Sequence, residues 1–244
     1  MAALSLGDRD VHVWEAPSDP LLEPSAVREC LALLSPAERA RHDRFLFERD
    51  RHTFRVAHAL LRSVLTRYLD VAPAALAFDE GPHGRPEVRS AHGPRPLRFS
   101  LSHTTGHVAC AVTSRADCGI DVEDLERHGP RVDTDVSSRF SRWEAEGLDS
   151  LPAAARRERF FALWTLKESV LKATGEGLSR PLDSFALDVD TPAGDVLRAR
   201  DGLEEGEWRF WRWRPSARHR AAVAVRTAAR EPLDLVRRTW DGPC

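Results

Sequence analysis

The spacing of apolar residues predicts two helical regions, residues 25–69 and roughly residues 134–177. Apolar positions recur at helical intervals in "FRVAHALLRSVLTRYL", and again in "RERFFALWTLKESVLKATG". Ser35 is a good N-cap with Pro36 at the first helical position, and Gly175 is a good C-cap. Pro152 interrupts the second region.

Between and after these regions, apolar residues alternate or run together as they do in strands. Residues 78–96 are rich in Gly and Pro, which predicts turns around short strands. The predicted strands are "VHVWEAP", "LRFSLSH", "HVACAVT", "CGIDVEDL", "SFALDV", "EWRFWRWR" and "RAAVAVRT". In "EWRFWRWR" the alternation breaks at Phe210-Trp211, which predicts a bulge or bend. Together the elements predict an α+β fold.

The two helical regions resemble each other. Placing residues 54–65 over residues 160–171 matches Phe, Leu, Ser, Val and Leu in register, although two amphipathic helices also match by chance. At face value the match predicts two similar lobes, residues 1–113 and 114–244. Arg62 stands in the first copy where the second has Glu168.

Composition narrows the class of protein. Charged residues are 30% and hydrophobic residues 42% of 244, as in a soluble globular chain, and the net charge of -2 gives no general attraction to nucleic acid or an anionic membrane. No apolar run approaches the ~20 residues of a membrane helix, and the start lacks a secretory pattern. The four cysteines form no CxxC motif, so we expect reduced thiols and a cytoplasmic protein.

Lysine is confined to one stretch. Of 36 Lys plus Arg residues only Lys167 and Lys172 are lysine, and both lie in "WTLKESVLKATGEGL". On a helix, Trp164, Glu168 and Lys172 share a face. The simpler interpretation is an exposed Glu168–Lys172 pair worth ~0.2–0.5 kcal/mol. Arginine would serve such a pair equally well, whereas a compact ammonium beside phosphate or a metal is not interchangeable with a guanidinium.

A second acidic pair lies in "GIDVED". On a strand, Asp121 and Glu123 face the same side about 7 Å apart. Alone, this pattern is usually a solvated strand edge. Combined with Glu168, it predicts an oxygen-rich site suited to Mg²⁺, which binds carboxylates and substrate phosphates.

A third segment, "RFSLSHTTGH", ends a predicted strand with Ser102 and His103, which suit an anion. No nearby acid orients His103, so a Ser-His-Asp hydrolase is not favoured. Gly106 indicates a turn before His107, which argues against a shared metal site for the two histidines.

Five motifs occur in order along the chain. They are "GRP" (84–86), "FSLSH" (99–103), "GIDVE" (119–123), "FSRWE" (140–144) and "WTLKESVLKATGEGL" (164–178). Together they resemble the 4'-phosphopantetheinyl transferases, in particular the long two-lobed type that activates peptide and polyketide synthases. The resemblance covers most of the chain from about Ser35 to Val189. It implies that the active site lies at the interface of two lobes within a monomer.

The resemblance also implies a reaction. The family transfers the phosphopantetheine arm of coenzyme A to a serine of a carrier protein and releases 3',5'-ADP. In this chain Asp121, Glu123 and Glu168 would hold Mg²⁺, with Mn²⁺ as a substitute, against the coenzyme pyrophosphate. Lys172 would contact that pyrophosphate and stabilise or protonate the leaving phosphate. Glu168, directly or through water, is the preferred base for the serine, and Glu144 is the alternative.

Other residues would bind the coenzyme. The resemblance places Ser102 and His103 at its phosphates, Arg85 beside the adenine, and Arg41 and Arg44 at the 3'-phosphate. Several relatives carry lysine at positions 41 and 85, but arginine keeps the charge and binds phosphate well.

Three alternatives remain open at this point. A different Mg²⁺-dependent phosphoryl enzyme, such as a phosphohydrolase, could use the same carboxylates. A non-catalytic carrier-binding module is expected to lose acidic ligands, and all three are present. "EWRFWRWR" interleaves aromatics and arginines as in single-strand nucleic acid binding, but a strand covering the core is the favoured interpretation, so we expect no nucleic acid partner.

Overall fold

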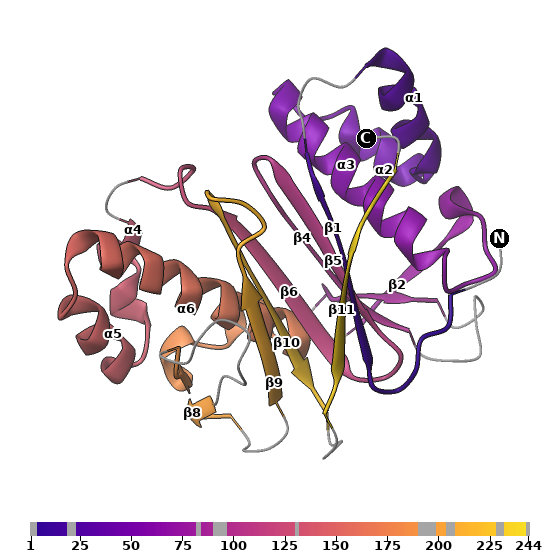
Figure 1. Cartoon of the computed structure of the whole chain (residues 1–244). Helices are drawn as coiled ribbons and strands as arrows, with labels where there is room; N and C mark the ends of the chain where they lie inside the picture. Colours follow the sequence, from indigo (N-terminus) through magenta and orange to yellow (C-terminus); the bar gives the residue numbers. More distant parts are fainter. Residues whose placement is uncertain are drawn as a thin grey trace. The chain divides into compact units, whose positions relative to one another are not determined.

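The structure is a computed structural model that describes residues 4–18, 23–81, 84–89, 97–129, 132–189, 199–203, 208–227 and 232–242. The chain forms two compact units, residues 1–116 with 233–244, and residues 117–232 (Figure 1). The sequence assigned the whole tail to the second lobe. The structure places its last strand in the first unit, because that strand pairs with the first strand of the chain.

The first unit contains a four-stranded sheet. Its order is β11 (Asp234–Thr239), β1 (Asp10–Pro17), β5 (His107–Thr113) and β4 (Arg98–Thr104). β11 runs parallel to β1, whereas β5 is antiparallel to both β1 and β4. Gly106, with φ 81°, closes the tight turn between β4 and β5.

Helices cover this sheet. α3 (Glu48–Leu65) packs on β5 and β4 and buries Leu60 and Val64, and α1 (Pro24–Leu33) packs against α3 (Figure 1). α2 (Pro36–His42) begins at Ser35, as the sequence predicted. A 3-10 turn η1 (Pro73–Ala75) follows the helices, and the hairpin of β2 (Phe78–Glu80) and β3 (Pro86–Val88) lies in the predicted region of turns and short strands.

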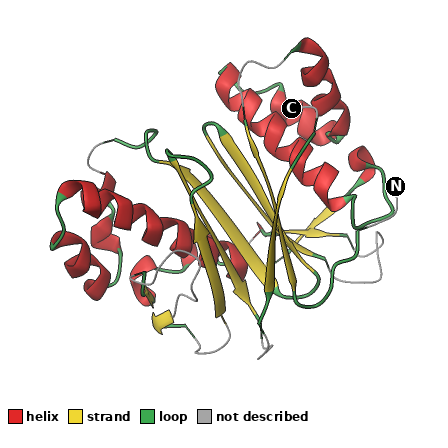
Figure 2. Ribbon diagram, viewed as in Figure 1, coloured by secondary structure: helices red, strands yellow, loops and turns green. Residues whose placement is uncertain are grey.

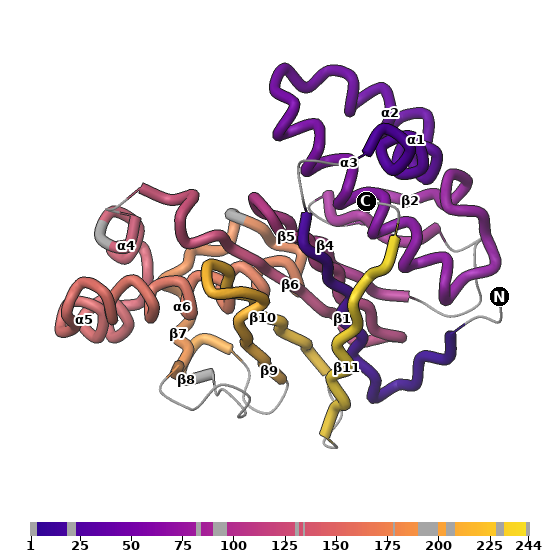
Figure 3. Tube along the Cα trace, turned by 45° about the horizontal axis from the view of Figure 1, so that its top comes forward, coloured from indigo at the N-terminus to yellow at the C-terminus, as the bar shows by residue number. Residues whose placement is uncertain are grey.

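The second unit has a three-stranded antiparallel sheet with one long helix. The strand order is β6 (Asp117–Asp124), β10 (His219–Arg226) and β9 (Trp208–Trp213). α6 (Ala153–Thr174) packs along all three strands, and α5 (Arg142–Asp149) and α4 (Val132–Asp135) pack against α6 (Figures 2 and 3). Short elements complete the unit: η4 (Ser137–Arg139), η5 (Gly177–Ser179), η6 (Leu182–Ser184), β7 (Ala186–Leu187) and β8 (Ala199–Asp201).

The bulge expected in β9 is absent. The register between β9 and β10 continues without a shift from Trp213 opposite Ala221 to Trp208 opposite Arg226. Trp208 and Phe210 lie in the core, with ring centroids 5.9 Å apart, and neighbouring Trp211 belongs to the other face. The register excludes the bulge, because the strand accommodates half-buried Trp211 on the face opposite to Phe210.

Two further expectations concern the whole chain. Cys110 and Cys118 are buried free thiols, but Cys30 is disulfide-bonded, so the expectation of reduced thiols is wrong at Cys30. Among the described helices, none is both long enough and apolar enough to cross a membrane.

Glu38 connects α2 to α3. Its carboxylate contacts Nδ1 of His58 and Nε of Arg62, and it closes the capping box with Ser35. Burial alone would raise the pKa of Glu38, but the hydrogen bonds from His58, Arg62 and the Ser35 backbone outweigh it and lower that pKa to about 2. The folded unit therefore favours the charged carboxylate.

We predict that Glu38→Gln destabilises the first unit by about 3 kcal/mol at pH 7, from the fall in pKa between 4.5 and about 2. Because the folded pKa is the lower one, this stabilisation is complete above about pH 4.5 and is lost as the pH falls toward 2. Urea unfolding at several pH values measures the difference from wild type. The control Asp79→Asn removes a carboxylate that pairs with Arg89, both side chains being exposed, and should change little. If the difference in the free energy of unfolding between wild type and Glu38→Gln does not become smaller in acid, the charged Glu38 carboxylate is not the source of the stabilisation.

Candidate functional site

The candidate site rests on the close approach of α6 to β6. Gly119 in β6 has no room for a side chain, since a Cβ there would lie 1.9 Å from the Ser169 carbonyl oxygen and 2.6 Å from the Ala173 nitrogen. The glycine of "GIDVED" therefore lets the helix backbone touch the strand. This contact brings Glu168 and Lys172 beside the acidic end of β6.

Four of the predicted residues meet there. Nζ of Lys172 donates to Oδ1 of Asp121 at 2.7 Å, and the Asp121 side chain is buried whereas Lys172 is partly exposed. Glu168 and Glu123 each interact electrostatically with Asp121. Among the described residues, no three His, Cys, Asp or Glu side chains already have the arrangement of a metal site.

The carboxylates of Asp121, Glu123 and Glu168 make one another's charged form less favourable. Burial raises the pKa of Glu168 to about 7, with Asp121 and Glu123 adding to the rise and Lys172 opposing it. Burial also raises the pKa of Glu123, and Asp121 adds to that effect. One ammonium group among three acids leaves an excess of negative charge, which a divalent cation would neutralise.

Glu123 is oriented by two side chains. Nε1 of Trp164 donates to its Oε1 at 3.1 Å, and Nε2 of His128 lies 2.9 Å from its Oε2. The sequence placed Trp164 on the correct helix face. It missed His128, which follows β6 in an irregular segment where no periodicity indicates direction; only its nearness in sequence to Glu123 was a signal.

Glu144, the alternative base, is fully buried. Its Oε2 accepts hydrogen bonds from the Ser141 nitrogen and hydroxyl, and its Oε1 accepts from the Leu187 nitrogen at 2.9 Å. Nζ of Lys167 lies 2.9 Å from Oε2, and both side chains are 0% exposed. These contacts join α5 to α6 and β7, and they do not favour Glu144 as a base for an incoming hydroxyl.

Lys167 is a structural residue. Its ammonium donates to the carbonyl oxygens of Leu182 and Phe185, each at 2.7 Å, besides pairing with Glu144. It also lies over the Phe185 ring at 4.2 Å. An ammonium with its three donors engaged is a compact group that a planar guanidinium does not replace. Lys167 thus has a structural reason to be lysine, whereas the role of Lys172 stays a prediction.

Apart from Asp121 and Lys172, the predicted coenzyme-binding residues belong to the first unit. Ser102 is buried and His103 exposed on β4, Arg41 and Arg44 are exposed at the end of α2, and Arg85 lies just before β3. Arg85 lies in a turn closed by a bond from the Gly81 nitrogen to its carbonyl oxygen. Their roles, and the expectation of an active site between two lobes, stay predictions.

Sequence comparisons agree with the motifs. Residues 117–225 match the model of a family described as the 4'-phosphopantetheinyl transferase superfamily, and residues 22–115 match one described as 4'-phosphopantetheinyl transferase, N-terminal. The solved holo-[acyl-carrier-protein] synthase of Thermotoga maritima aligns with 47% of this chain and 66% of its own, at 19% identity and a TM-score of 0.36, which is too low to add to the argument.

Individual relatives cover most of both chains. The 4'-phosphopantetheinyl transferase HetI of Nostoc sp. is 37% identical over 182 residues, which are 72% of this chain and 73% of HetI. Sfp of Bacillus subtilis is 30% identical over 161 residues, 64% of this chain and 67% of Sfp. The L-aminoadipate-semialdehyde dehydrogenase-phosphopantetheinyl transferase of Mus musculus is 27% identical over 219 residues, 83% of this chain and 71% of its own.

We predict that Gly119→Ala destabilises the second unit by more than about 3 kcal/mol, because the added methyl group must push α6 away from β6. Gly147→Ala in α5 is the matched control. A Cβ there meets nothing closer than Arg159 Nη2 at 3.8 Å, so helix propensity should stabilise it by about 0.5–1 kcal/mol. Thermal unfolding followed by circular dichroism measures both. Equal effects of the two alanines would contradict the proposed close contact.

We predict that Lys167→Met lowers the free energy of unfolding by about 3–5 kcal/mol, since it leaves the Glu144 carboxylate buried without its cation. In the Lys167→Met variant, adding Glu144→Gln should lower the free energy of unfolding much less than the same substitution does in the wild type. The double-mutant cycle, measured by urea unfolding, should show a coupling of about 1–3 kcal/mol. Additive effects would mean that the two side chains do not form a pair.

Proposed function

The chain belongs to the 4'-phosphopantetheinyl transferase superfamily, and we propose that Asp121, Glu123 and Glu168 hold the magnesium ion of its reaction. It is an enzyme that transfers the 4'-phosphopantetheine group of coenzyme A to a carrier protein. The observation that supports the site is the packing of α6 on β6, which brings Glu168 and Lys172 to Asp121.

The donor set fits magnesium. All three side chains offer oxygen, the ligand atom that Mg²⁺ prefers, and Mn²⁺ accepts the same ligands. Burial and mutual repulsion raise the pKa of Glu168 and Glu123, so a cation at this place would be stabilised by the charges it neutralises. When bound, magnesium supplies positive charge against the coenzyme A pyrophosphate.

Lys172 is proposed to stabilise the leaving group, 3',5'-ADP. Its ammonium is held next to Asp121 and its side chain is 30% exposed, so it can reach a ligand as well as its protein partner. We assign it to the phosphate oxygen that becomes part of 3',5'-ADP. There the ammonium stabilises the negative charge that develops as the P–O bond breaks, or donates a proton to it.

Glu168 is proposed as the base for the serine of the carrier protein. The hydroxyl oxygen of the carrier serine forms the new P–O bond, and its proton must pass to a base within hydrogen-bonding reach. Glu168 accepts that proton directly or through a water molecule.

The first unit carries the groups proposed for the rest of coenzyme A. Arg41 and Arg44 are exposed guanidinium groups suited to the 3'-phosphate, and Arg85 is assigned to the adenine. Ser102 and His103, adjacent on β4, are assigned to phosphate oxygens. Since one chain forms both compact units, we propose that it acts as a monomer on its carrier protein.

We predict that Glu168→Gln and Lys172→Ala each lower the turnover by at least about 100-fold while the fold is retained, because each removes one charge used in the transfer. Lys172→Arg should also be damaging, since a guanidinium does not reproduce a point charge. Mass spectrometry of a carrier protein incubated with coenzyme A and Mg²⁺ measures the transfer.

Glu146→Gln serves as the control for this series, because Glu146 is an exposed residue of α5 that pairs with exposed Arg142. It should transfer at the wild-type rate. A parallel reaction without carrier tests for a phosphohydrolase, which would free phosphopantetheine there. Near-normal rates in both Glu168→Gln and Lys172→Ala would overturn the site.

A further inference from the structure

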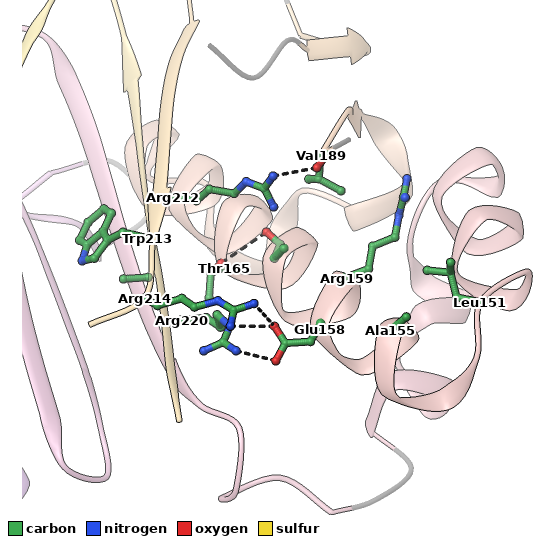
Figure 4. A pocket seen from close by; sticks show the side chains of 12 residues that line it. Leu151, Ala155, Glu158, Arg159, Thr165, Val189, Arg212, Trp213, Arg214 and Arg220 are labelled. Carbon is green, nitrogen blue, oxygen red and sulfur yellow. Dashed lines mark hydrogen bonds and ion pairs between the residues drawn. The ribbon is translucent and has the colours of Figure 1, made fainter. Parts of the chain in front are cut away.

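A pocket of ≈ 470 Å³ opens in the second unit between the first half of α6 and the strands β9 and β10 (Figure 4). Ligand pockets commonly have volumes of ≈ 300–1,000 Å³. Ala155, Arg159 and Ala162 line it from one face of α6. Glu168 and Lys172 lie further along α6 and are not among the residues that line the pocket.

Small side chains leave this space open. Ala155 and Ala162 lie seven residues apart on α6, where longer residues would fill the gap, and Ala221 lines it from β10. Leu151 and Val189 add to the apolar wall. A hydrocarbon group placed here would bury apolar surface that water now meets.

The same pocket is rich in positive charge. Four arginines line it but only one acid, Glu158. Arg220 binds both Glu158 oxygens and Arg214 also donates to Oε2 at 3.1 Å, so one carboxylate orders two guanidinium groups (Figure 4). Arg212 is fixed by a bond to the Val189 carbonyl oxygen at 2.9 Å. Arg214 and Arg220 together carry one positive charge more than the single carboxylate that they share.

We infer that this pocket binds a small amphiphilic anion, with a carboxylate or phosphate head group at the arginines and a short hydrocarbon body against the alanines. The guanidinium fork matches both head groups, because each offers two oxygens to parallel N–H donors. The apolar wall distinguishes this ligand from a free inorganic anion. The site goes beyond the transfer reaction and does not depend on it.

Isothermal titration calorimetry of the full chain tests the inference with octanoate and octyl phosphate as probes and octanol as the uncharged control. We expect saturable binding of at least one anion, with octanol at least about tenfold weaker, since charge-assisted hydrogen bonds contribute about 1.5–3 kcal/mol. The tighter of the two anions identifies the head group. Octanol binding as tightly as both anions, or no saturable binding of either, would overturn the proposal.

Variants locate the binding. Arg212→Gln and Arg159→Gln should each weaken the anion about tenfold, and Ala162→Phe, which fills the space, should abolish binding without changing charge. Ala155→Leu, at an exposed position of the pocket, repeats the filling test if Ala162→Phe does not fold. Arg142→Gln removes an exposed arginine outside the pocket and should bind like wild type. Undiminished binding in both filled variants, or equal loss in Arg142→Gln, would overturn the site.

A final arm separates this site from the transfer reaction. Glu168→Gln should bind the anion as wild type does, whatever its transfer rate. Saturating coenzyme A should not displace the probe. Displacement would place the pocket within the coenzyme site and overturn its independence.

Discussion

The contact between the backbones of α6 and β6 is the constraint on which the second unit depends. Gly119 is the position where the helix touches the strand, because a single methyl group there would collide with the Ser169 carbonyl. With the two elements this close, acids from the strand and from the helix are forced into one environment. A lysine two turns along the helix from Trp164 then meets Asp121. The packing of the α6 backbone on β6 therefore determines which charged side chains lie close together.

Around that contact, buried ion pairs and hydrogen bonds hold α5, β7 and the Glu123 side chain in place. Lys167 and Glu144 hold α5 and β7 to the helix that carries Glu168. Trp164 and His128 hold the two oxygens of Glu123. A site of like charges is unfavourable by itself, so its geometry must be supported by neighbours that are satisfied.

Much of this followed from local sequence pattern, and the rest required long-range pairing. The cap at Ser35 and the helices of residues 48–65 and 153–174 depend on spacing and residue chemistry, whereas the convergence of Asp121 with Glu168 was predicted from the combination of two motifs. The pairing of β11 with β1 and of Lys167 with Glu144 joins residues distant in sequence, which periodicity does not specify. The arginine-lined pocket likewise combines α6, β9 and β10, and no single motif marks it.

A crystal structure grown with coenzyme A and Mn²⁺ would locate the metal site, because manganese is identified by its anomalous scattering. We expect one manganese peak bound by carboxylate oxygens of Asp121, Glu123 and Glu168, with the coenzyme pyrophosphate on the same ion and Lys172 at a phosphate oxygen. A metal elsewhere in the molecule, or a pyrophosphate bound away from these residues, would show that the proposed metal site is wrong.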